Sequence, residues 1–168
     1  LEQIFEFEQR GDVIEGSKGA EMTVALVLVV NIAQEAFDCN VAIGAQTLAA
    51  LTSGTDNMAL GYSALQSVTT GTANTSVGRN SLSSATAPGS GVALGYYAMA
   101  NSTGTITGVT ALGRQAGYAT TGAYGTFVGS FAGFGATSGA NNIYLGSQSG
   151  YYSTTQSNEL IINSLDRT

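Results

Sequence analysis

The sequence predicts an all-β fold, a parallel β-solenoid or β-roll of about seven coils. Two observations predict it. A glycine preceded by an aliphatic residue recurs at spacings of 17, 17, 17, 18, 16 and 17 residues, and the side chains before each glycine alternate in character, as they do along a strand. These glycines are Gly44, Gly61, Gly78, Gly95, Gly113, Gly129 and Gly146. At one strand spacing of about 4.8 Å per coil, seven coils would form a rod about 34 Å long.

The strand before each glycine has one face rich in aliphatic residues. One position before the glycine stand Ile43, Leu60, Val77, Leu94, Leu112, Val128 and Leu145, and three positions before stand Val41, Met58, Thr75, Val92, Thr110, Thr126 and Ile143. We expect this face to point inward. Because its columns run the length of the rod and would leave an apolar stripe on a lone chain, we expect a homotrimer to bury them at its axis. The expected trimer core is Val41, Ile43, Met58, Leu60, Val77, Val92, Leu94, Leu112, Val128, Ile143 and Leu145.

Between these columns the other strand face is small at first and aromatic later: Ala42, Ala59, Ser76, Ala93, Ala111, Phe127 and Tyr144. After each glycine we expect a kink and a second short strand whose third residue is small. Its fourth residue is Leu48, Leu65, Leu82 or Met99 in the first four coils, then Gly117, Gly133 or Gly150 followed by Tyr118, Phe134 or Tyr151. This change predicts that the apolar plug moves by one residue. Polar stretches with a glycine at the tip, such as 52–55, close each coil as turns.

The seven repeated glycines are expected to serve backbone geometry, either a positive φ or a close approach of two backbones. A phosphate-binding loop is not indicated, because no Gly-Lys-Ser or Gly-Lys-Thr follows any glycine-rich stretch.

Charge divides the chain in two. Residues 1–38 contain eight acidic and two basic residues, whereas the rest of the chain contains three of each. With five basic residues in all and a net charge of −6, no nucleic-acid partner is expected. The longest apolar run, 24–30, is far shorter than the roughly 18 residues that span a bilayer, and the acidic start is unlike a signal peptide, so membrane insertion is not expected either.

Catalysis is not expected, and neither is a cofactor or a metal. The sequence holds no histidine and one cysteine, which removes the usual general base and the common metal ligands. The stretch from Ile43 to Thr47 also fits one hexapeptide of the left-handed β-helices of acyltransferases, but those need three hexapeptides per coil and typically a histidine. Cys39 is expected to be a buried, unreactive thiol, with an interchain bridge as the alternative.

The repeated pattern Asn40-Val41-Ala42-Ile43-Gly44, Asn57-Met58-Ala59-Leu60-Gly61 and Asn142-Ile143-Tyr144-Leu145-Gly146 resembles the head repeats of trimeric bacterial adhesins, which are left-handed parallel β-rolls. The segment from Gly139 to Arg167 resembles repeats in bacteriophage tail and head fibres even more closely. The resemblance covers about residues 40–166 and implies a homotrimeric rod on a virion or a cell surface. It departs where Gly91, Val109 and Gly125 replace the asparagine, so an unbroken asparagine ladder is not expected.

A second column of interest directly follows the glycines, and it contains Tyr62, Arg79, Tyr96 and Arg114. If the coils stack in register, guanidinium groups can lie on rings in neighbouring coils. These four residues, called the Tyr/Arg strip below, are the candidate surface for a host glycan or receptor; a self-stabilising surface ladder is the alternative.

Three segments follow from this organisation: 1–38, an N-terminal β-rich segment that docks onto other virion proteins or caps the solenoid; 39–156, the β-roll repeats; and 157–168, a C-terminal cap strand. The favoured function is that of a virion structural protein, a trimeric tail fibre, head fibre or capsid-decoration rod that contributes to host attachment. A head fragment of a bacterial surface adhesin is the alternative. Ice binding by a flat threonine array is less favoured, because the threonines are expected not to form one uninterrupted column.

Overall fold

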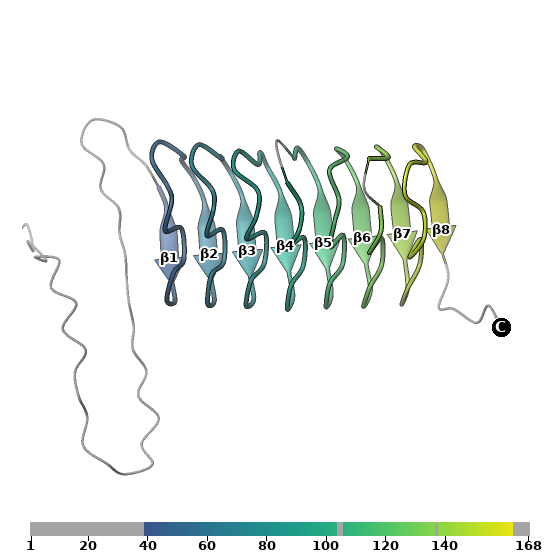
Figure 1. Cartoon of the computed structure of the whole chain (residues 1–168), viewed down its shortest axis with the longest axis horizontal. Helices are drawn as coiled ribbons and strands as arrows, with labels where there is room; N and C mark the ends of the chain where they lie inside the picture. The colour runs from purple at the N-terminus through teal and green to yellow at the C-terminus, as the bar shows by residue number, and fades with distance from the viewer. Residues whose placement is uncertain (1–38, 104–105, 137, 163–168) are drawn as a thin grey trace, which may run out of the picture.

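The computed structural model describes residues 39–103, 106–136 and 138–162, and over them the chain is a β-solenoid of about seven turns. Eight three-residue strands form one parallel sheet in sequence order (Figure 1). They are β1 (Val41–Ile43), β2 (Met58–Leu60), β3 (Thr75–Val77), β4 (Val92–Leu94), β5 (Thr110–Leu112), β6 (Thr126–Val128), β7 (Ile143–Leu145) and β8 (Leu160–Ile162). The all-β class and the repeat of about 17 residues predicted from the sequence are confirmed. The expected N-terminal docking or capping segment, 1–38, lies outside the described residues.

Neighbouring strands pair in the register that the repeat specifies. Ala42 pairs with Ala59, and Phe127 pairs with Tyr144. The register is kept where the spacing is 18 and then 16 residues, around β5, so the turns absorb the extra and the missing residue. Each column read along the sequence is therefore a column in space.

The strand face that points into the coil is the opposite of the one expected. The middle residue of each of the first seven strands is buried, with Ala59, Phe127 and Tyr144 at 0% exposure, whereas the aliphatic residues on either side are half-buried or exposed. The cause is the narrow width of the coil. Large side chains that follow the kink fill the interior from the other side, which leaves room on the strand for Ala or Ser in the early coils.

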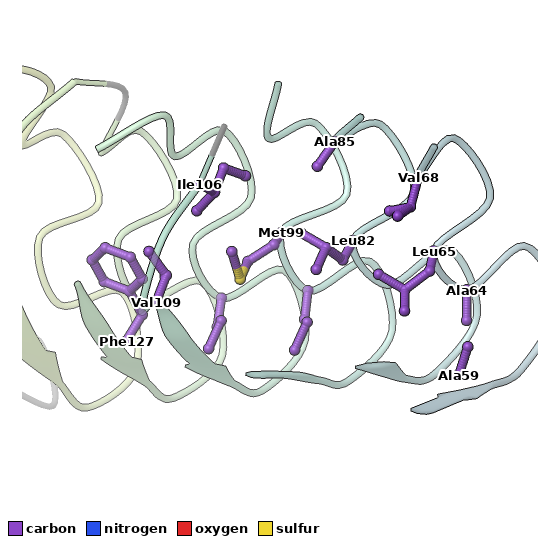
Figure 2. Close-up of a cluster of buried hydrophobic side chains, with 14 of the residues drawn as sticks. Ala59, Ala64, Leu65, Val68, Leu82, Ala85, Met99, Ile106, Val109 and Phe127 are labelled. Atoms are coloured by element: carbon purple, nitrogen blue, oxygen red, sulfur yellow. The ribbon is translucent and has the colours of Figure 1, made fainter. Parts of the chain in front are cut away.

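The segment after each kink is a run of turns rather than the expected second strand. Its second and fourth residues have positive φ in every described coil; in the first they are Gln46 at 59° and Leu48 at 50°. This left-handed backbone is unusual for residues other than glycine, and it turns the fourth side chain inward. Figure 2 shows Leu65, Leu82 and Met99 following one another along the inside of the solenoid.

The interior of the later coils is filled from the strand. Gly117, Gly133 and Gly150 keep the positive φ of the fourth position, at 56° to 61°. Since glycine has no side chain, the volume that leucine or methionine fills in the earlier coils is available to another residue. The rings of Phe127 and Tyr144 occupy that space. The prediction that the plug moves to the residue after these glycines is therefore wrong: Tyr118, Phe134 and Tyr151 lie half-buried on the surface.

The kink glycines stack directly on one another. All seven have φ between 114° and 142°, a region that side chains rarely adopt. A Cβ on Gly78 would lie 2.5 Å from the carbonyl oxygen of Gly95 and 2.7 Å from its carbonyl carbon. Both the conformation and the backbone contact thus exclude a side chain at this position.

A buried asparagine ladder runs through the first coils and stops where the repeat pattern departs. Asn57 Nδ2 donates to Asn40 Oδ1 (3.1 Å) and to the Gly71 carbonyl (2.8 Å), and Asn74 Nδ2 donates in the same way to Asn57 Oδ1 (2.8 Å). Gly91 ends the ladder with its N–H on Asn74 Oδ1 (2.9 Å). Each amide thus bridges two coils, which satisfies buried polar groups that would otherwise be unpaired.

The last coil places a glutamate where earlier coils have asparagine, and this glutamate pairs with a core tyrosine. Tyr144 Oη donates to Glu159 Oε2 at 2.7 Å. Burial of the ring, followed by this hydrogen bond, raises the pKa of Tyr144 to about 12. The folded protein therefore holds the phenol proton at a pH where the unfolded chain, with a tyrosine pKa of about 10, loses it.

The melting temperature is consequently expected to fall as pH rises from 10 to 12, because the unfolded state then binds fewer protons than the folded state. Tyr144→Phe removes the titrating group, so the melting temperature of this variant should fall less between pH 10 and pH 12. Because the variant also lacks the hydrogen bond to Glu159, its melting temperature at neutral pH should be lower than that of the wild-type protein. Thermal melts followed by circular dichroism between pH 8 and pH 12 measure both slopes. Equal slopes in the two proteins would contradict the assignment.

Candidate functional site

The first candidate surface is the aliphatic stripe, formed by the aliphatic residues on either side of the middle position in each strand. On the single chain it lies on the outer face of the sheet, with Met58 49% and Leu60 43% exposed. The other residues of the expected trimer core are half-buried to exposed on the same face. Since strand register is kept throughout, the stripe is continuous from β1 to β8, where Leu160 and Ile162 extend it.

The second candidate surface is the Tyr/Arg strip. Tyr62 and Tyr96 are each 46% exposed, and Arg79 and Arg114 are exposed as well. Their backbones are held one coil apart by hydrogen bonds. Asn80 N–H donates to the Tyr62 carbonyl (2.8 Å), and the same bond recurs on the carbonyls of the other three strip residues. The strip is therefore a fixed row of side chains on an ordered backbone.

The strip side chains pair with rings, partly in the expected way. The Arg79 guanidinium carbon lies 5.5 Å from the centre of the Tyr62 ring in the preceding coil. Arg114 lies over Phe131 of the following coil at 4.9 Å, while the Tyr96 ring lies against Tyr97, 4.5 Å away. The four residues therefore do not form one continuous stack. Each arginine instead rests on one ring, a contact worth about 0.5 to 1 kcal/mol at an exposed site.

A stack of three aromatic rings continues from the strip, and the sequence analysis missed it. Phe134 lies 4.9 Å from both Tyr118 and Tyr151, with interplanar angles of 7° and 9°. Phe131 contacts Phe134 at 5.8 Å and so joins this stack to Arg114. The sequence signal for it is an aromatic residue five positions after each of three kink glycines, a pattern that predicted a place in the interior for these residues.

A threonine column is also present, contrary to the expectation from the sequence. Every coil has threonine eight positions after the kink glycine: Thr52, Thr69, Thr86, Thr103, Thr121, Thr137 and Thr154; Thr137 lies outside the described residues. Thr52 Oγ1 donates to the Thr69 carbonyl (2.9 Å), and Thr69 Oγ1 donates to the Thr86 carbonyl (3.1 Å). These hydroxyls thus hold adjacent turns together.

The part of the chain that the structure describes offers few other groups that could bind a ligand or take part in a reaction. It contains no group of three or more histidine, cysteine or acidic residues that could hold a metal. Over the same ranges, no helix is long and apolar enough to cross a membrane. Cys39 is exposed, so the expectation of a buried thiol was wrong; the residue precedes β1, at the end of the solenoid.

No protein-family model, curated protein or solved structure matches the chain. Function is therefore inferred from the geometry of the aliphatic stripe and the Tyr/Arg strip, together with the resemblance of the repeats.

Proposed function

We propose that the protein is a structural component of a virion: a homotrimeric fibre or capsid-decoration rod, displayed on a bacteriophage particle and contributing to attachment to the host surface. The observation that carries the proposal is the aliphatic stripe. Solvent-exposed apolar patches of this continuity usually mark an interaction surface. A straight stripe along a straight rod is complementary to copies of itself around a common axis, which is the geometry of a closed cyclic oligomer.

The virion assignment is supported by the segment from Gly139 to Arg167, which resembles repeats in bacteriophage tail and head fibres. The whole net charge of −6 lies in residues 1–38, because the rest of the chain has as many basic as acidic residues. This segment also differs in composition from the coils, which favours a role in docking onto other virion proteins or in capping the rod. The alternative is the head of a bacterial trimeric adhesin at the cell surface, which would use the same stripe for its trimer.

Replacing Leu94, in the central strand β4, with aspartate is expected to break the trimer. The variant would place a carboxylate from each chain in an apolar interface, at a free-energy penalty of several kcal/mol per chain. Sedimentation velocity should show a trimer for the wild-type protein, and monomer or aggregate for Leu94→Asp.

The matched control is Ser90→Asp, which introduces the same charge in the same coil. Ser90 is exposed with φ 53°, a conformation that aspartate tolerates, and Asp56 occupies the equivalent position before β2. This control should remain a trimer with an unchanged melting temperature. A monomeric wild-type protein, or a trimeric Leu94→Asp variant, would overturn the axial placement of the stripe.

The location on a virion has its own test. Antibodies raised against residues 39–162 should decorate purified phage particles in electron micrographs, at the tail or on the capsid. Labelling of the bacterial cell surface in cultures free of phage would instead favour the adhesin alternative.

A further inference from the structure

We propose that the Tyr/Arg strip binds a linear acidic polysaccharide that lies along the rod, with acidic groups on alternate sugars held by Arg79 and Arg114. This inference rests on the proposed role in host attachment and names the class of receptor. It draws on the charge distribution, the fixed geometry of the guanidinium groups and their spacing.

Charge is segregated between the two ends of the strands. Between residues 39 and 162 the only basic residues are Arg79 and Arg114, and the only acidic ones are Asp56 and Glu159. Both arginines directly follow a kink glycine at the C-terminal end of a strand, whereas both carboxylates precede a strand. The carboxylates also have local partners, since Asp56 accepts from Thr55 (3.1 Å) and Glu159 from Tyr144 (2.7 Å). The strip therefore holds both positive charges of this part of the chain together with aromatic rings, and the two carboxylates lie at the other end of the strands.

The guanidinium groups are oriented in advance. Each lies over a ring, at 5.5 Å for Arg79 on Tyr62 and 4.9 Å for Arg114 on Phe131. Contact with the ring restricts the long side chain while leaving N–H donors available to a carboxylate or sulfate. Such charge-assisted, bidentate pairs are the strongest hydrogen bonds that a surface offers, and a restricted arginine loses less entropy in forming them.

The spacing of the two arginines indicates a repeating polymer. The backbones of Arg79, after β3, and Arg114, after β5, lie two coils, or about 10 Å, apart along the rod. Their guanidinium groups lean away from each other, Arg79 toward the ring in the preceding coil and Arg114 toward the ring in the following coil. An extended polysaccharide with an acidic group on every second sugar repeats that group over a length similar to the backbone spacing, so it offers each arginine a carboxylate within reach of the side chain. Between the arginines lies Tyr96, 46% exposed, whose ring offers an apolar surface to the C–H groups of the intervening sugar.

An acidic peptide fits the strip less well. The strip carbonyls already accept hydrogen bonds from the next coil: the Tyr97 N–H donates to the Arg79 carbonyl (3.0 Å), and the Gln115 N–H donates to the Tyr96 carbonyl (2.9 Å). A peptide could therefore not add as a strand along this row, which is the usual way an extended chain binds a β-protein. Recognition must come from side chains alone, and a polysaccharide is suited to that.

The experiment measures binding of the full chain to immobilised hyaluronate oligosaccharides, which carry one carboxylate per two sugars. Dextran of similar length is the neutral probe and polyglutamate is the acidic peptide probe. We expect binding to hyaluronate only. The Arg79→Gln/Arg114→Gln variant should lose about tenfold in affinity per arginine, and Tyr62→Ala/Tyr96→Ala should also bind more weakly, with the oligomeric state unchanged in both.

The matched control is Arg10→Gln/Lys18→Gln, which removes the same charge from the segment 1–38 and should bind as the wild-type protein does. Equal losses in the two double variants would mean a general charge effect and would overturn the site. Failure to bind hyaluronate, or equal binding to polyglutamate or dextran, would overturn the acidic-polysaccharide assignment. Sedimentation of the same samples separates this inference from the proposed function: a trimer that does not bind refutes only the former, and a monomer that binds through the arginines refutes only the trimer.

Discussion

Gly78→Ala is expected to destabilise the solenoid by about 3 to 5 kcal/mol, a large effect for the addition of one methyl group. The backbone at Gly78 has φ 131°, which is accessible essentially to glycine alone. The new Cβ would also lie 2.5 Å from the Gly95 carbonyl oxygen of the next coil. That oxygen belongs to another kink glycine, so it cannot move without disturbing the column. Urea denaturation followed by circular dichroism measures the loss.

Gly89→Ala is the matched control, because it adds the same methyl group where the structure has room. Gly89 has an ordinary φ, and the nearest atom to its Cβ would be Thr107 Oγ1, 4.0 Å away. Its stability should change by less than about 1 kcal/mol, and a small gain is the expected direction. A Gly78→Ala variant as stable as Gly89→Ala would show that the kink column tolerates side chains.

The repeat made the positions of the strands predictable. The aliphatic residue before each glycine, with alternation before it, placed the first seven of the eight strands at the residues where the structure has them. The reason is that in a solenoid each repeat in the sequence forms one coil in space. The pairing of strands in neighbouring coils therefore follows from the repeat length alone. Few folds allow this, because most strand pairings depend on tertiary contacts that the local sequence does not encode.

The assignment of inside and outside was not predictable from the same pattern. Alternation shows that Ala59 and Leu60 lie on opposite faces, but not which face is enclosed. Choosing the more hydrophobic face as the interior is the usual inference, and it fails here because the coil interior is filled by Leu65 and its counterparts. What points outward is then the larger aliphatic side chain, available for a partner.

The turns after the kink could not be predicted from the sequence, for a different reason. Residues with positive φ are usually glycine or asparagine, yet here Gln46 and Leu48 adopt it. The backbone hydrogen bonds of neighbouring coils impose the conformation, as when the Leu48 N–H donates to the Ala64 carbonyl (3.1 Å). When hydrogen bonds between coils impose a conformation, the residue type at that position does not indicate it. The only sequence signal is the glycine at the fourth position of the later coils, and this glycine is equally compatible with a shift of the plug by one residue.

The two ways of filling the coil can be exchanged by mutation. The second coil combines Ala59 on the strand with Leu65 after the kink, whereas the sixth combines Phe127 with Gly133. The backbones are alike at the fourth position, with φ 52° at Leu65 and 61° at Gly133. A Cβ on Gly133 would collide with the Phe127 ring. Leucine at 133 and phenylalanine at 127 therefore compete for one volume.

Phe127→Ala alone is expected to cost about 3 to 5 kcal/mol by opening a cavity, and Gly133→Leu alone should be destabilising by overpacking. The double variant Phe127→Ala/Gly133→Leu restores the combination of the second coil, so its loss should be smaller than the sum by about 2 kcal/mol or more. Urea denaturation of the four proteins gives the coupling. Phe127→Ala/Gly150→Leu is the comparison, because a Cβ on Gly150 meets Tyr144 at 2.5 Å and acts on Phe127 only through the contact of the two rings, whose centres lie 5.5 Å apart. Its coupling should be clearly smaller than that of the first pair. Additivity in the first pair would show that the leucine and the phenylalanine do not occupy the same volume of the solenoid interior.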